Sequence, residues 1–149
     1  MSKYLKIGIM LAALGQPLYS AASETPEQAV AMVHKAVLYL KANGKDKTIA
    51  EANNPKGEFV HGDLYVAITD MTGKALANPM LPRSVGKDLS AVRDIDGKYF
   101  VKDRLEMLKA KPQGWIDYKW PNPISKKIEL RSTYFERVDD LVIACGIYK

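Results

Sequence analysis

The sequence has little of the residues that cross-link a small protein or hold a metal ion. It contains one cysteine, Cys145, and two histidines, His34 and His61, in 149 residues. One cysteine cannot form an internal disulfide, and no C-x-x-C-H pattern for haem attachment occurs. Neither histidine has a second ligand at metal-binding spacing. We therefore expect a fold without disulfide, metal or cofactor, in which Cys145 is a buried and inert thiol.

Charge of one sign is not concentrated anywhere in the chain. The formal net charge is +5, from 22 Lys and Arg residues against 17 Asp and Glu residues. The basic residues are scattered among acidic ones, as in EFVHGD and VKDRLE. Because nucleic-acid binding needs a basic patch or stripe, we do not expect a nucleic acid as partner.

Signatures of catalysis are also missing. The sequence has no nucleophile elbow, no phosphate-binding loop and no metal-ligand spacing. Asp139 and Asp140 are adjacent, so in a strand they would point to opposite faces, which is a poor arrangement for paired acid and base. An enzyme is therefore not predicted, although a small exported enzyme remains an alternative.

The longest apolar stretch lies at the N-terminus and is short. Lys3 and Lys6 precede an apolar run over residues 7–14, and Ser20 and Ala22 are small enough for cleavage after Ala22. The run is shorter than the roughly 20 residues that span a bilayer. We interpret residues 1–22 as a signal peptide, rather than a retained anchor, and residues 23–149 as a single periplasmic or secreted domain.

Intact-mass analysis of protein from the extracytoplasmic fraction tests this interpretation. We expect a chain that begins at Ser23, because signal peptidase accepts small residues such as Ser20 and Ala22. Recovery of only the full-length chain, in the membrane fraction, would contradict the prediction.

The first half of the domain predicts a long helix followed by a hairpin. Thr25, Pro26 and Gln28 form a helix start, apolar residues follow at helical spacing, and Gly44 supplies the stop. This helix of about 18 residues has one apolar side, so it should lie across a sheet. A helical turn at 48–52, a short strand at 59–61, a strand at 64–70 and a returning strand at 74–78 come next.

The second half predicts a loop, a helix and three strands. Residues 79–97 contain two prolines and two glycines and predict a long loop, with at most a helical turn near residues 89–93. A helix is expected at 98–111, and strands at 113–120 and 128–138. Residues 141–148 are almost continuously apolar, which predicts a central strand covered on both sides.

The hairpin at 113–134, QGWIDYKWPNPISKKIELRSTY, carries the candidate site. We expect one of its faces to hold aromatic rings beside a cation and hydroxyl groups, contributed by Tyr118, Trp120, Tyr134, Arg131, Ser132 and Thr133, with Tyr65 beside them on the first long strand. Such a face suits the wall of a pocket for an anionic ligand. The alternative is an amphipathic hairpin that packs its rings into a core, with Arg131 at the surface beside Glu129 or Asp139.

Several segments resemble the single Cache domain, a PAS-like extracytoplasmic sensor module. They are LYVAITDMTGKALANP, VGKDLSAVRDIDGKYFV, GWIDYKWPNP, KKIELRSTYFERV and DDLVIACGIYK, in the family's order and over about residues 26–149. The resemblance implies an α+β fold: an antiparallel sheet of about five strands, with the N-terminal helix on one face and a loop plus helix closing a ligand pocket on the other.

The resemblance also implies a function. We expect a sensor-type domain that binds a small organic carboxylate through Tyr65, Tyr118, Trp120, Arg131, Ser132 and Tyr134. Cache sensors usually continue into a membrane helix, whereas this sequence ends at Lys149, so a stand-alone exported form that serves a membrane receptor or signalling partner is expected. An interaction protein that pairs an edge strand with a partner is the other alternative.

Overall fold

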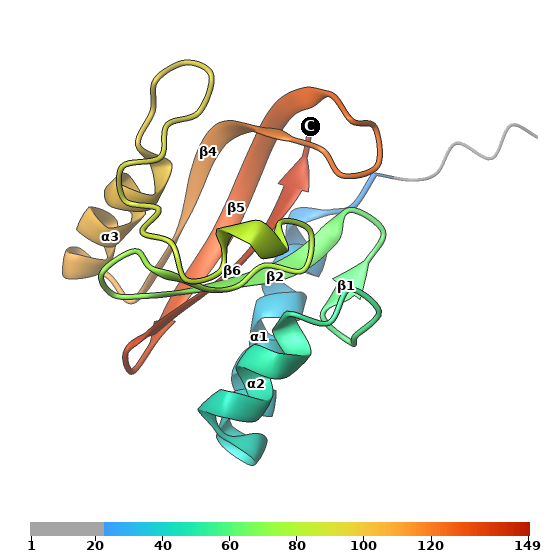
Figure 1. The fold of residues 1–149 in the computed structure, drawn as a ribbon, viewed down its shortest axis with the longest axis vertical. Coiled ribbons are helices and arrows are strands. Elements are labelled where there is room, and N and C mark those ends of the chain that lie inside the picture. Colours follow the sequence, from blue (N-terminus) through green and yellow to red (C-terminus); the bar gives the residue numbers. More distant parts are fainter. Residues whose placement is uncertain (1–22) are drawn as a thin grey trace, which may run out of the picture.

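The structure is a computed structural model that describes residues 23–149, so the expected signal peptide lies outside the described residues. Its elements are shown in Figure 1 and are, in order, α1 (Pro26–Asn43), α2 (Lys45–Ala52), β1 (Val60–His61), β2 (Leu64–Asp70), β3 (Ala75–Ala77), the 3-10 helix η1 (Pro82–Ser84), α3 (Phe100–Ala110), β4 (Gln113–Pro121), β5 (Ile128–Val138) and β6 (Leu141–Tyr148).

One antiparallel sheet forms the centre of the domain. Its order is β1-β2-β6-β5-β4, and β3 also pairs with β2. The sheet therefore has six strands rather than about five, because residues 60–61 pair with the start of β2. The last strand, β6, lies between β2 and β5, and all eight of its residues are buried. The prediction of a central strand covered on both faces is confirmed.

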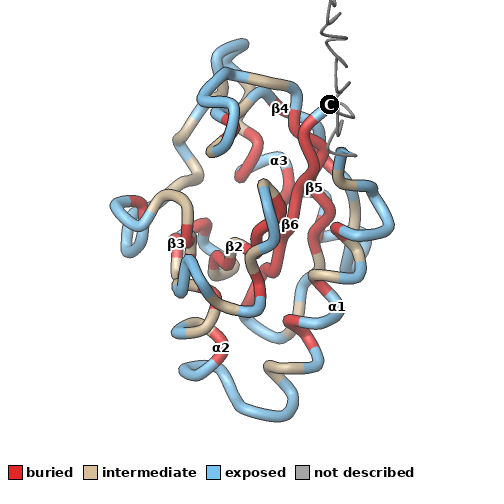
Figure 2. Tube along the Cα trace, turned by 90° about the vertical axis from the view of Figure 1, so that its right-hand side faces the viewer, coloured by how far each residue is buried: buried red, intermediate tan, exposed pale blue. Residues whose placement is uncertain are grey.

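The two faces of the sheet have different covers. Helix α1 packs against β5 and β6 on one face, whereas α3 and the 78–99 segment lie on the other (Figures 1 and 2). Buried residues follow the sheet and the inner side of α1, and exposed residues dominate the 78–99 segment (Figure 2). The arrangement confirms the predicted α+β class.

Helix α1 begins where the sequence predicts. Thr25 Oγ1 accepts a hydrogen bond from the Gln28 backbone N–H at 3.3 Å, and Gln28 Oε1 accepts one from the Thr25 N–H at 2.6 Å. This capping box satisfies two backbone donors at the helix start. At the other end Gly44 adopts φ 82°, a conformation that glycine reaches without strain.

The helical turn within residues 79–97 lies elsewhere than predicted. It is η1, which begins at Pro82, a residue whose fixed φ suits the first position of a helix. Near residues 89–93 the chain forms only a single turn, closed by the hydrogen bond from the Val92 N–H to the Leu89 carbonyl at 3.1 Å. Asp88 Oδ1 accepts the Ser90 N–H at 2.8 Å, which favours a turn over a helix. The second long helix is also shorter than predicted, Phe100–Ala110 instead of 98–111.

The 78–99 segment is fastened to the sheet. Ala75 exchanges backbone hydrogen bonds with Lys87 and Gly86, at 2.9 and 2.8 Å. Asp94 Oδ2 accepts the Lys119 N–H of β4 at 2.9 Å, and this hydrogen bond lowers the pKa of the Asp94 carboxyl.

In residues 23–149, no helix is long and apolar enough to cross a membrane.

The core between α1 and the sheet can be tested with two substitutions on one helix. Val33 is fully buried and Leu38 is 66% exposed. Val33→Ala should lower the free energy of unfolding by about 2 kcal/mol, because it removes buried apolar surface and leaves a cavity. Leu38→Ala should change it by less than about 0.5 kcal/mol. Urea denaturation measures both, and equal effects would contradict this packing.

Candidate ligand-binding site

A cavity of about 130 Å³ lies between the sheet and the cover formed by α3 and the 78–99 segment. Its walls are mostly apolar, with two arginines and a few hydroxyl groups. The lining residues are Tyr65, Ala67, Ile68, Thr69, Ala75, Ala77, Asn78, Leu81, Ser84, Leu89, Val92, Phe100, Val101, Arg104, Tyr118, Trp120, Arg131, Thr133 and Ala144. An apolar enclosure with a few polar groups is the usual form of a small-molecule site.

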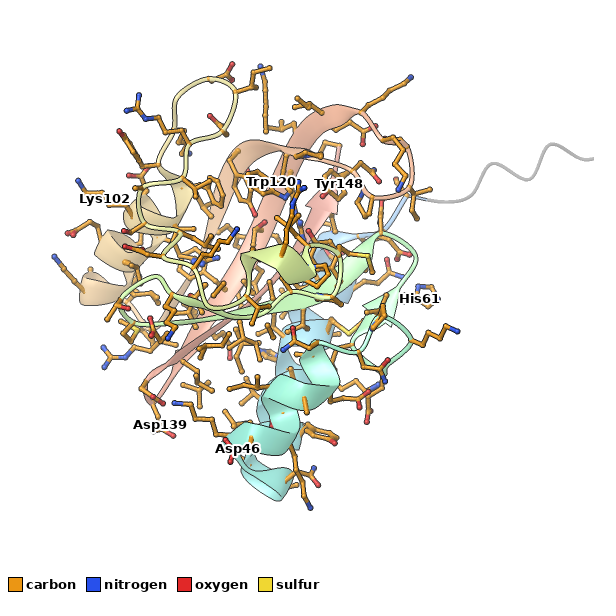
Figure 3. All side chains as sticks on the ribbon, in the orientation of Figure 1. Asp46, His61, Lys102, Trp120, Asp139 and Tyr148 are labelled. Atoms are coloured by element: carbon orange, nitrogen blue, oxygen red, sulfur yellow. The ribbon has the colours of Figure 1, made fainter. Side chains whose placement is uncertain are left out.

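Strand register brings the aromatic wall together. Tyr118 of β4 lies opposite Arg131 of β5, so both point to the cavity side of the sheet. The ring of Phe100 from α3 stacks on Tyr118, with centroids 4.0 Å apart, and meets Trp120 edge-on at 5.0 Å. Figure 3 shows Trp120 and Tyr148 at one end of the sheet.

Arg131 is a buried cation surrounded by phenol groups. Only 3% of its surface is exposed, and its Nη1 donates to the hydroxyl oxygens of Tyr65 and, at 3.2 Å, Tyr148. The guanidinium carbon lies 4.3 Å from the Tyr65 ring centroid, which adds a cation–π contact. Burial alone lowers the pKa of Arg131, but the surrounding tyrosines outweigh it and the pKa is raised. Arg131 therefore stays charged.

The surface alternative for Arg131 is wrong. Glu129 Oε1 and Oε2 accept hydrogen bonds from Ser125 and Asn122 instead, at 2.6 and 2.8 Å. Asp139 occupies the two-residue turn between β5 and β6, where it has φ 54°. Neither carboxylate lies within ion-pair distance of Arg131.

A second buried arginine, Arg104 of α3, was not among the predicted site residues. It is 5% exposed and its Nη2 donates to Thr69 Oγ1 of β2 at a long 3.4 Å. Burial lowers the pKa of Arg104, and the positive charge of Arg131 lowers it further. The signal was present in the sequence, since Arg104 lies three residues after Val101 and four before Leu108 and thus on the buried face of the helix.

The structure brings four of the six predicted site residues together: Tyr65, Tyr118, Trp120 and Arg131. It separates the other two, because adjacent residues of a strand point to opposite faces. Ser132 lies opposite Asp117 and donates to its Oδ1 at 2.5 Å. Tyr134 packs 5.3 Å from Trp115 on the α1 face and donates to Glu136 Oε1 at 2.6 Å. The prediction that Ser132 and Tyr134 lie beside Arg131 is therefore wrong, because their side chains point to the opposite face of the sheet.

The histidines and the cysteine lie away from the cavity. His34 Nε2 is 2.8 Å from Glu136 Oε1, and His61 Nδ1 is 3.2 Å from Glu24 Oε1; both histidines are exposed. Cys145 is buried in the core under α1, where burial raises the pKa of its thiol to about 12. Within residues 23–149, no three side chains of metal-binding type cluster together.

The family model for single Cache domain 2 matches residues 20–149. The chain belongs to this family. A methyl-accepting chemotaxis protein of Pseudomonas putida, McpP, is 27% identical over 92 residues, which cover 60% of this chain and 17% of that protein. The match thus spans less than a fifth of the relative's length.

Solved structures agree on the fold of this Cache domain. A methyl-accepting chemotaxis protein from Vibrio parahaemolyticus has a TM-score of 0.69 at 22% identity, covering 82% of this chain and 86% of that one. The periplasmic sensor domain of a chemotaxis protein has a TM-score of 0.65 at 20% identity, covering 82% and 88%. A Cache chemosensory domain described for carboxylic acid recognition has a TM-score of 0.65 at 19% identity, covering 82% and 86%.

Gly146 makes room for Arg131, and its substitution tests the geometry. Gly146 lies opposite Thr133 in β6, and a methyl group there would overlap Arg131 Nε and Thr133 Oγ1. Gly146→Ala should therefore displace the Arg131 side chain and lower the free energy of unfolding by about 1–3 kcal/mol. It should also weaken binding of any ligand that depends on Arg131.

Gly114→Ala is the matched control. A methyl group at Gly114 would crowd Phe135, 3.0 Å away, and Met107, neither of which lines the cavity. It should cost stability without changing ligand affinity, as measured by denaturation and calorimetry. Equal ligand affinity in both variants would show that Gly146 does not position Arg131.

Proposed function

We propose that this Cache domain is an exported sensor-type module that binds a small organic carboxylate in the cavity beneath α3. The observation that carries the proposal is the burial of Arg131 against the hydroxyl groups of Tyr65 and Tyr148, with no carboxylate of residues 23–149 beside it. A buried cation is expensive unless an anion pairs with it. A ligand carboxylate can accept two parallel hydrogen bonds from a guanidinium group.

The size of the cavity limits the ligand to a few heavy atoms. Pockets for drug-sized ligands have volumes of about 300–1,000 Å³, whereas this cavity has about 130 Å³. Phe100, Tyr118 and Trp120 would contact the hydrocarbon part of the ligand and exclude water, which strengthens the charge-assisted hydrogen bonds. Carboxylic acid recognition by a Cache domain of the same fold supports this ligand class.

The relatives support a sensory role of the domain beyond binding. They are two methyl-accepting chemotaxis proteins and the periplasmic sensor domain of a chemotaxis protein. We propose a periplasmic or secreted location and a membrane receptor or signalling partner that responds to the occupied domain.

A thermal-shift panel of short carboxylic acids identifies the ligand. An acid that binds the folded protein raises its melting temperature, because binding stabilises the native state by mass action.

Arg131→Ala tests the charged contact. It should weaken binding of the identified acid by about 2–5 kcal/mol, because the carboxylate loses its partner inside a dry cavity. Trp120→Ala should weaken binding through lost apolar contact. Isothermal titration calorimetry with the acid measures both variants.

Arg137→Ala is the control, since it removes the same charge from the same strand at an exposed position. It should bind as the parent protein does. If Arg131→Ala also binds like the parent, Arg131 does not hold the carboxylate and the proposed site is wrong.

A further inference from the structure

The cavity contains two buried guanidinium groups rather than one. Arg131 comes from the sheet and Arg104 from the covering helix α3, and both line the same cavity. They are 3% and 5% exposed. A single carboxylate needs only one of them, so the second cation requires its own explanation.

No acidic side chain in the described part of the chain neutralises either arginine. The ion pairs within residues 23–149 all involve other groups, and most lie at the surface. Arg104 contacts one hydroxyl, that of Thr69, and the Nε atoms of Arg104 and Arg131 both lack a hydrogen-bond partner. Two uncompensated cations in one apolar cavity repel each other and are each poorly solvated.

The geometry points to a ligand with two anionic groups: a short dicarboxylate that places one carboxylate on Arg131 and the other on Arg104. The inference rests on the proposed function and narrows its ligand class. Such a ligand neutralises both cations, whereas a monocarboxylate leaves one of them buried without a counter-charge. On β2, Ala67 lies between Tyr65, which contacts Arg131, and Thr69, which contacts Arg104. Ala144 of β6 is the partner of Ala67, and both small residues line the cavity. The volume of about 130 Å³ limits the linking chain of the ligand to a few carbons.

Calorimetry with pairs of acids of equal carbon number tests the inference. The pairs are propionate with malonate and butyrate with succinate, and succinamate serves as an analogue of succinate that lacks one charge. In each pair the dicarboxylate should bind about 10- to 100-fold more tightly, as expected for one additional set of hydrogen bonds between charged groups. Succinamate should bind like butyrate.

Arg104→Met identifies the second contact. It keeps the length and packing of the side chain without its charge, so it should abolish the preference for dicarboxylates by weakening their binding far more than that of monocarboxylates. It should also raise the melting temperature of the ligand-free protein, because it removes an unpaired buried charge. Lys102→Met, on the exposed side of the same helix, should change neither property.

The outcomes separate this inference from the function on which it rests. If monocarboxylates bind as tightly as dicarboxylates, or if Arg104→Met weakens both classes equally, the two-anion ligand is wrong while the carboxylate site stands. If none of the acids binds, both are wrong. The acid panel on the unaltered chain decides the question even if Arg104→Met does not fold.

Discussion

The alternation of side chains along β5 is the constraint on which both halves of the domain depend. Arg131 and Thr133 face the cavity, while Tyr134 faces α1. A shift of one residue in the β5–β6 register would exchange the two faces and place a cation against the apolar side of α1. The eleven residues of β5, paired with β4 on one edge and β6 on the other, hold this register along their length.

The buried cation Arg131 also organises the strands around it. The Tyr148 hydroxyl donates to the Pro121 carbonyl at 2.9 Å and accepts from Arg131, so it links β4, β5 and β6 at one point. Burial raises the pKa of Tyr148, which keeps the phenol neutral. A neutral phenol solvates the guanidinium group without cancelling its charge. The charge therefore remains available to an anion.

Local sequence signals predict the strands and the long helix well because they depend on near neighbours. The capping box of Thr25 and Gln28, and the apolar run of β6, need no information from distant residues. The sequence alone also predicts that Tyr134 and Arg131 point to opposite faces, because side chains alternate along a strand and these residues are three apart. Arg104 was harder to recognise as a site residue, because only the folding of α3 over the sheet brings it to Thr69, 35 residues earlier in the chain.

The sheet is continuous beneath the cavity, so a solute cannot reach it from the α1 side. On the other face the cavity is covered by α3, which packs on the edge strand β4. Because Arg104 belongs to α3 and Arg131 to β5, the distance between the two cations depends on how α3 packs against the sheet.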